Sequence, residues 1–237
     1  MNQTSITVVV WNLEWAPTTG RRADFIRGMI DEHRPDIVCL TEARLGFLRE
    51  GYEILAGGNY SPTALRDRRK VLLWSKCPWA HTNTEEKISV PGRYIRGVTS
   101  SLLGPITVHG LCVPYPMSNV TYGSRDRKPW EDHERYLEEL SKIVRPSGRS
   151  LVMGDFNQRF PRVKAPGHLF DDLFVKVLKN FNLLTGARAG IPNMIDHLAV
   201  SEFPGFRSEI SVLKRNPAGG PRLSDHDGFS MRLSFTY

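Results

Sequence analysis

The sequence contains few cysteines and no long apolar run, and both features exclude classes of protein. Its three cysteines, Cys39, Cys77 and Cys112, are widely separated and form no CxxC pair. A disulfide framework and a structural zinc site are therefore not expected, and buried free thiols are. The first residues lack a basic segment followed by a long apolar stretch. We therefore expect no secretory signal, no membrane span or membrane partner, and a cytoplasmic protein.

Internal repeats and low-complexity segments are also missing from the chain. Its hydrophobic content of 40% and aromatic content of 10% are ordinary for a globular protein. A length of 237 residues is enough to bury a large core without division into smaller units. We therefore expect residues 1–237 to form a single domain.

Runs of β-branched and large apolar residues, each bounded by polar residues, predict buried strands. Five of these runs read VVVWNLE, DIVCLTE, SLVMGDFNQ, IDHLAV and SDHDGFSM. Three more occupy residues 70 to 74, 93 to 103 and 106 to 113, with a tight turn predicted at Gly104-Pro105 between the last two. Apolar side chains at helical spacing predict helices over residues 21 to 33, 130 to 144 and 170 to 181. These elements favour two packed sheets with helices outside them.

Acidic and amide side chains occur at the ends of the first five runs. They are Asn12, Glu14, Glu42, Asp155, Asn157, Asp196 and Asp225, with His197 and His226 beside the last two. If the strands converge, these groups meet at one rim of the fold. Such an oxygen-rich site is what hard cations such as Mg²⁺ or Mn²⁺ require.

Five motifs in this order, WNLEW, LTEA, GDFNQ, IDHLAVS and SDHDG, resemble those of the endonuclease/exonuclease/phosphatase superfamily. These proteins are metal-dependent phosphoesterases that include DNase I-like nucleases. The resemblance extends over residues 11 to 229. It implies an α/β fold with a four-layer α/β/β/α sandwich, in which two mostly antiparallel sheets pack together between helices. It also implies an active site at one edge of the sandwich.

Phosphodiester hydrolysis requires a nucleophilic water, neutralisation of charge at phosphorus and help for the leaving oxygen. The resemblance implies that Glu42 is the main ligand of Mg²⁺ or Mn²⁺, with Asp225 and Glu14 contributing directly or through water. Many family members have Asp where this chain has Glu14, and the added methylene displaces the carboxylate. Glu14 is therefore the weaker candidate for direct ligation.

Asp155 is the candidate to take a proton from the attacking water, and Asn157 to orient that water or donate to a phosphate oxygen. Both side chains point to one side if the strand is extended there. The resemblance implies that Asp196 holds His226 in its charged form and that His226 contacts the phosphate. It also places Asn12 at the phosphate, and the alternative for Asn12 is a hydrogen-bonding role at the strand end. His197 is expected to face the opposite side of its strand and to be structural.

One phosphate-contacting position in ITVHGLCVPYP has two possible alignments. The resemblance implies a histidine or tyrosine there. Matching the histidine selects His109, which is preferred for its chemistry, whereas matching VP selects Cys112. Strand alternation places these two residues on opposite faces, so both alignments cannot hold. If Cys112 is the match, Tyr115 or another residue of the following loop supplies the missing contact.

The net charge is +7, from 32 Lys and Arg residues against 25 Asp and Glu residues. The cations form clusters at residues 66 to 70, 125 to 128, 159 to 164 and 214 to 222. Two clusters adjoin GDFN and SDH, which favours a nucleic acid as the partner. The function that these features predict is a nuclease that hydrolyses DNA or RNA. The alternatives are a phosphatase or phosphodiesterase of a small metabolite, nucleotide or phospholipid headgroup, and a noncatalytic nucleic-acid-binding module.

Overall fold

The computed structural model describes residues 3–57, 65–83, 88–121, 123–186, 193–203 and 205–236. Within these residues, the first of two six-stranded sheets has the strand order β11-β12-β1-β2-β4-β3. In that order the strands span Phe206–Leu213, Gly228–Thr236, Gln3–Asn12, Ile37–Arg44, Arg68–Ser75 and Tyr52–Leu55. Strands β1 and β2 are parallel, and the other neighbours are antiparallel.

The second sheet, over the same described ranges, has the order β5-β6-β7-β8-β10-β9. In that order its strands span Trp79–Asn83, Tyr94–Ser101, Gly104–Cys112, Ser150–Asp155, Asp196–Ser201 and Asn182–Leu183. Only β7 and β8 form a parallel pair among the described neighbours in this sheet. The mostly antiparallel pairing agrees with the predicted sandwich.

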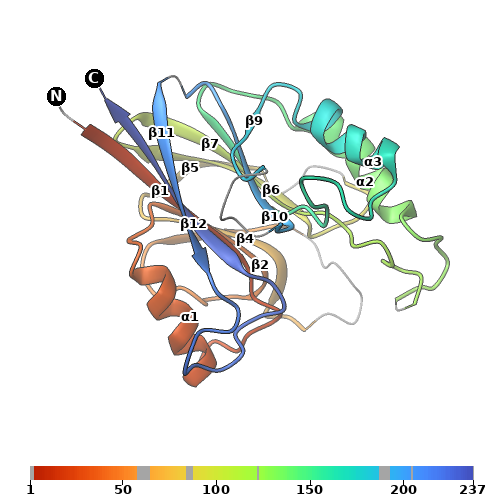
Figure 1. Ribbon diagram of the computed structural model, residues 1–237, viewed down its shortest axis with the longest axis horizontal. Coiled ribbons are helices and arrows are strands. Elements are labelled where there is room, and N and C mark those ends of the chain that lie inside the picture. The colour runs from red at the N-terminus through yellow and green to blue at the C-terminus, as the bar shows by residue number, and fades with distance from the viewer. Residues whose placement is uncertain are drawn as a thin grey trace.

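Three buried apolar clusters hold the layers together. Val8 and Val10 of β1 point into the core between the two sheets, whereas Val9 and Trp11 point into a second core under helix α1. Successive strand residues face opposite sides, and β1 is covered on both, which explains its uninterrupted apolar run. A third core lies between the second sheet and helix α2. The fold is therefore the predicted α/β/β/α sandwich, with helices on both outer faces (Figure 1).

The described helices are α1 at Arg21–Asp31, α2 at Glu131–Ile143, α3 at Gly167–Asp171 and the π-helix η1 at Asp172–Val177. The prediction of one regular helix over residues 170 to 181 was wrong. The chain instead passes from α3 into π turns, in which the Leu178 N–H donates to the carbonyl of Leu173, five residues back. No helix among the described segments is long and apolar enough to span a membrane.

The hairpin between β6 and β7 turns two residues earlier than predicted. Ser101 pairs with Gly104, so the turn residues are Leu102 and Leu103, and Gly104 and Pro105 already belong to β7. The Ser101 hydroxyl accepts from the Leu103 N–H at 3.0 Å and donates to the Gly104 carbonyl at 2.9 Å. This side-chain bridge closes the turn.

Gly154, the residue before Asp155, is expected to tolerate no side chain. It has a φ of 140°, and a Cβ atom there would lie 1.9 Å from the carbonyl oxygen of Leu111. We expect Gly154→Ala to lower the free energy of unfolding by about 3 kcal/mol or more. Gly28→Ala is the matched control, because it adds its Cβ to open space on α1 and is expected to stabilise by about 0.5–1 kcal/mol. Urea unfolding of both variants tests this prediction. Equal free energies of unfolding for Gly154→Ala and Gly28→Ala would contradict it.

Candidate active site

The predicted site residues lie at one rim of the sandwich because the strand registers bring their strand ends together. Strand β1 runs parallel to β2, so Asn12 lies beside Thr41. Strand β12 is antiparallel to β1, which places the segment before Gly228 near the same end. In the second sheet, Asp155 at the end of β8 pairs with Asp196 at the start of β10. Strands β8 and β10 both contact β1, so the two sheets contribute to one site.

Asp155 joins the two sheets through its carboxylate. Its Oδ2 accepts from the Asn12 side-chain amide at 3.0 Å, and its Oδ1 accepts from the Asn157 backbone N–H at 2.9 Å. The side chain is only 2% exposed. Burial raises the pKa of Asp155 to about 7, and the positive charge of His226 opposes that shift. The structure thus places Asn12, Asp155 and Asn157 together, as the sequence predicted.

Asn157 reaches the site by a turn and not by the predicted extended strand. Strand β8 ends at Asp155, and Asn157 has a φ of 50°. An aspartate side chain that accepts the N–H two residues later forms a tight turn, and that contact is present here. The Asn157 amide also donates to the Val113 carbonyl at 2.8 Å. The D-x-N spacing therefore has a physical reason, but it differs from the one proposed from strand alternation.

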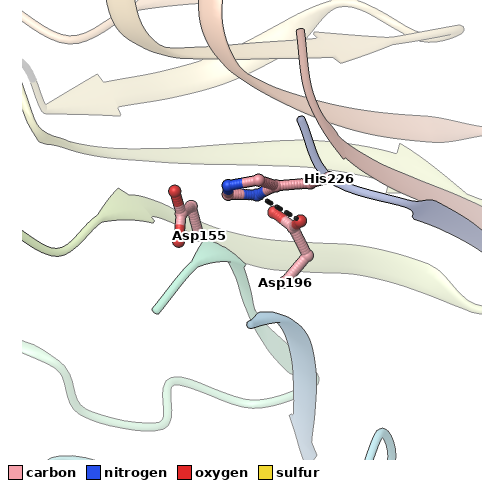
Figure 2. A group of neighbouring side chains, drawn as sticks. All are labelled: Asp155, Asp196 and His226. Carbon is pink, nitrogen blue, oxygen red and sulfur yellow. Dashed lines mark hydrogen bonds and ion pairs between the residues drawn. The ribbon is translucent and has the colours of Figure 1, made fainter. Parts of the chain in front are cut away.

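His226 and Asp196 form the predicted pair across thirty residues of sequence. Nδ1 of His226 lies 3.2 Å from Oδ2 of Asp196, which is fully buried. Figure 2 shows the imidazole lying between Asp196 and Asp155. Burial alone would lower the pKa of His226, but the hydrogen bond to Asp196 and the charges of Asp155 and Asp225 raise it to about 10. The imidazole is therefore a cation at neutral pH.

The contacts that hold the SDH segment in place were not predicted from the sequence. The buried hydroxyl of Ser224 donates to the Asn12 carbonyl at 2.5 Å and accepts from the His226 N–H at 3.2 Å. Trp11 Nε1 donates to the His226 carbonyl at 3.1 Å. Gly228 lets the chain pass this indole, since a Cβ there would lie 2.4 Å from it. The serine before Asp225 was the available sequence signal for this role.

Glu42 lies at an irregular point of β2, with a φ of 47°. Pairing with β4 continues at Thr41 and Ala43 but is interrupted at Glu42. Its Oε1 lies 2.5 Å from Nζ of Lys70 on β4, and Lys70 is 8% exposed. Left-handed backbone at a residue other than glycine is strained and is frequent at functional sites. From the sequence Lys70 was assigned only to a basic cluster, and this ion pair was not predicted.

Glu14 follows β1 in a turn, also with a left-handed φ of 46°. Both of its carboxylate oxygens contact arginines. Oε1 lies 2.8 Å from Arg222, and Oε2 lies 3.5 Å from Arg22. Direct metal ligation by Glu14 would require these ion pairs to rearrange, which agrees with its lower rank among the predicted ligands.

One group of possible ligand atoms is close enough to surround a cation. Among the described residues, Asp155, Asp196 and His226 offer atoms that all lie within 4.8 Å of one another. This trio differs from the predicted set of Glu42, Glu14 and Asp225. A charged imidazole has no lone pair for a metal, so we interpret the trio as an ion-pair cluster. The predicted ligands, Glu42 and Asp225 above all, stay predictions.

The structure corrects the preference for His109. Its Nδ1 lies 2.8 Å from the Tyr94 hydroxyl, and its ring packs on Phe181 in the core that faces the helices. His109 is therefore on the wrong face of β7 to contact a phosphate at the rim. Cys112 faces the core between the sheets, and its register partner is Asp155. Tyr115 is exposed in the following loop, and its substrate contact stays a prediction.

His197 is structural by its contacts, as expected, because both ring nitrogens have partners inside the fold. They lie 2.8 Å from the Thr185 hydroxyl and 2.9 Å from the Gln158 carbonyl. The nearby His133 similarly lies 2.7 Å from the Pro114 carbonyl and 2.7 Å from the Gln158 side chain. These two histidines fasten the loop after β8 to β10, α2 and the loop after β7.

Acid is expected to destabilise the fold through three neutral buried histidines. Burial lowers the pKa of His109, His133 and His197 to about 4 each, against an ordinary value of 6.5. Between these values the unfolded chain binds more protons, so the free energy of unfolding falls as pH falls from 6.5 to 4, by about 1.4 kcal/mol per pH unit for each histidine. We expect His109→Gln to reduce this slope by about one histidine's share. Urea unfolding at several pH values measures this slope. An unchanged slope in His109→Gln would contradict the interpretation of His109 as a neutral buried histidine.

Cations surround the acidic rim. A cleft of about 360 Å³ is lined by Arg159 and Arg215 together with Asp196, Asp225 and His226. Two of the predicted clusters, around residues 159 and 215, thus reach the site. The cluster at residues 125 to 128 is partly neutralised, since Arg127 contacts Glu131 and Asp132.

Comparisons with known proteins bear on the family and the fold. The model of the Endonuclease/Exonuclease/phosphatase family matches residues 9–226. A family protein of Bacteroides vulgatus is 15% identical, with a TM-score of 0.66, over 98% of this chain and all of that one.

Beta toxin 275-280 from Staphylococcus aureus is 17% identical, with a TM-score of 0.66, over 95% of this chain and 99% of that one. A beta toxin mutant with bound magnesium ions is 15% identical, with a TM-score of 0.62, over 98% of this chain and all of that one. These likenesses show the fold. A search of curated proteins found no match. The family model covers most of the chain, and the chain therefore belongs to the Endonuclease/Exonuclease/phosphatase family.

Proposed function

We propose that this protein is a divalent-metal-dependent phosphodiesterase that hydrolyses DNA or RNA by attack of water on phosphorus. Family membership supports a metal-dependent phosphoesterase in general. The observation that carries the narrower proposal is the cleft in which Arg159 and Arg215 lie beside Asp196, Asp225 and His226. Cations around an acidic centre favour a polyanionic backbone as the substrate.

The donor groups at the rim fit a hard divalent cation. They are carboxylates and amides, and Asp196 Oδ1 is buried with no hydrogen-bond partner among the described residues. Glu42 and Asp225 would hold Mg²⁺ or Mn²⁺, with Glu14 acting through water. When bound, the cation would neutralise charge on a phosphoryl oxygen.

The remaining residues bind the phosphate and move protons. Asp155 accepts a proton from the attacking water, and the donations from Asn12 and Asn157 favour its charged form. The Asn157 side chain orients the water or donates to phosphate. His226, kept cationic by Asp196, offsets the charge that develops on the phosphoryl oxygens.

A matched substrate panel tests the proposal. It comprises plasmid DNA, single-stranded DNA and RNA, an abasic-site duplex and bis-p-nitrophenyl phosphate, each with Mg²⁺ or Mn²⁺ and with a chelator. We expect kcat/KM to be highest on a polynucleotide and to fall with added salt, because binding releases counterions. Arg215→Gln is expected to reduce polynucleotide cleavage more than hydrolysis of the small ester. Arg207→Gln, an exposed change on β11, is the control. Turnover of the small ester alone would contradict the nuclease and favour a metabolite phosphoesterase.

A further inference from the structure

Lys70 places a buried ammonium on the carboxylate that is proposed to hold the divalent cation. Its Nζ lies 2.5 Å from Glu42 Oε1, and the residue is 8% exposed. The register of β2 with β4 pairs Thr41 with Val71. Because these strands are antiparallel, the next residue of β2, Glu42, lies opposite Lys70. The ion pair therefore joins the two strands at the residue where β2 is irregular.

The ammonium and a divalent cation make the same demand on Glu42. An ammonium donates its N–H groups to carboxylate oxygens, and these oxygens are also the atoms that bind Mg²⁺ or Mn²⁺. The two positive charges repel each other, and water screens that repulsion weakly where the lysine is buried. Lys70 and a divalent cation are therefore expected to exclude each other at Glu42 Oε1.

The indole ring of Trp15 offers the ammonium a second favourable position. Lys70 Nζ already lies 5.1 Å from the ring centroid, within the range of about 6 Å over which a cation interacts with an aromatic face. The backbone of Trp15 is fixed beside the same glutamate, since its N–H donates to the Glu42 carbonyl at 2.7 Å. An ammonium that leaves Glu42 therefore stays next to a group that stabilises it, which reduces the cost of breaking the ion pair.

We propose that Lys70 is a built-in competitor of the divalent cation for the Glu42 carboxylate. Its ammonium occupies Oε1 when no cation is bound and moves toward the Trp15 ring when one binds. Lys70 thereby lowers the affinity of the rim for Mg²⁺ or Mn²⁺ and keeps the cation exchangeable. This inference rests on the proposed function, in which Glu42 is a metal ligand.

Titration of chelator-treated protein with Mn²⁺ tests the proposal without any turnover, because electron paramagnetic resonance measures the free Mn²⁺. Lys70→Met keeps an unbranched apolar side chain but removes the charge, and it is expected to lower the Kd for Mn²⁺ by about tenfold or more. Lys142→Met is the matched control. It removes an exposed ammonium that pairs with Glu138 on α2, and its Kd is expected to stay within about twofold of wild type. A Lys70→Met protein that binds Mn²⁺ no more tightly than wild type, or not at all, would overturn the proposal.

A double-mutant cycle with Glu42→Gln separates competition for this carboxylate from a general effect of charge. If Lys70 acts through Glu42, Lys70→Met should change the Kd for Mn²⁺ far less in the Glu42→Gln background than in wild type. An equal tightening in both backgrounds would overturn competition at Glu42.

A crystal structure of the wild-type protein with Mn²⁺ decides the question if Lys70→Met does not fold. Mn²⁺ bound to Glu42, with Lys70 Nζ beyond hydrogen-bond distance of that carboxylate, would support the proposal. Mn²⁺ bound while Lys70 keeps its contact, or bound away from Glu42, would overturn it. Wild-type protein that binds Mn²⁺ but hydrolyses no phosphodiester would refute the proposed function alone, and the Kd values would still test Lys70.

Discussion

Asp155→Asn is expected to lower metal-dependent phosphodiester hydrolysis by roughly a thousandfold, the range that removal of a general base produces. The asparagine cannot accept a proton from water. Its amide would also present a donor to Asn12 or to the Asn157 N–H, both of which now donate to the carboxylate. The measurement is the initial rate on bis-p-nitrophenyl phosphate at saturating Mg²⁺.

Glu209→Gln is the control for Asp155→Asn, because it neutralises an exposed carboxylate on β11 away from the rim. It is expected to retain the wild-type rate. Circular dichroism and thermal unfolding verify that both variants are folded. A folded Asp155→Asn protein with wild-type turnover would exclude Asp155 as the base.

Asp196→Asn is expected to reduce turnover by roughly a hundredfold or more while leaving the substrate contacts of the other residues in place. The expected loss of turnover follows from the charge of His226, which Asp196 maintains. The carboxylate at 3.2 Å helps to raise the pKa of His226 to about 10, and an amide would no longer do so. NMR titration of the His226 imidazole should therefore give a lower pKa in the variant.

The ion pair of His226 and Asp196 also stabilises the folded protein, and the direction of its pH dependence is defined. A raised pKa in the folded protein means that the contribution is present below pH 6.5 and is lost as pH rises through about 10. Asp196→Asn should remove this loss of folding stability at alkaline pH. Glu138→Gln, an exposed change on α2, is the control. An unchanged His226 pKa in Asp196→Asn would contradict the role given to Asp196.

The sequence predicted the rim because its signals are local. A carboxylate at the end of an apolar run indicates a strand end whatever that strand pairs with, as Asp155 and Asp196 illustrate. The order of the five motifs along the chain carried the family resemblance. That resemblance in turn predicted the four-layer sandwich. The prediction of a shared rim was confirmed because the registers of β1 with β12 and of β8 with β10 bring these strand ends together.

The errors concern features that pairing and backbone conformation decide. His109 has the right chemistry, but the alternation of β7 turns it toward Phe181 and the helices. The left-handed φ of Asn157 cannot be inferred from a polar residue after a strand. Lys70 meets Glu42 only because β4 lies beside β2, although 28 residues separate them.

Hydrolysis of bis-p-nitrophenyl phosphate by chelator-treated protein, as Mg²⁺ or Mn²⁺ is added back, tests the central claim most directly. The wild-type rate is expected to be negligible without metal and to recover saturably. Glu42→Gln should remain at least about a hundredfold slower at the same metal concentration, since a neutral amide is a weaker ligand for a hard cation. Turnover that resists the chelator, or a Glu42→Gln protein as active as wild type, would contradict a metal-dependent phosphodiesterase site at this rim.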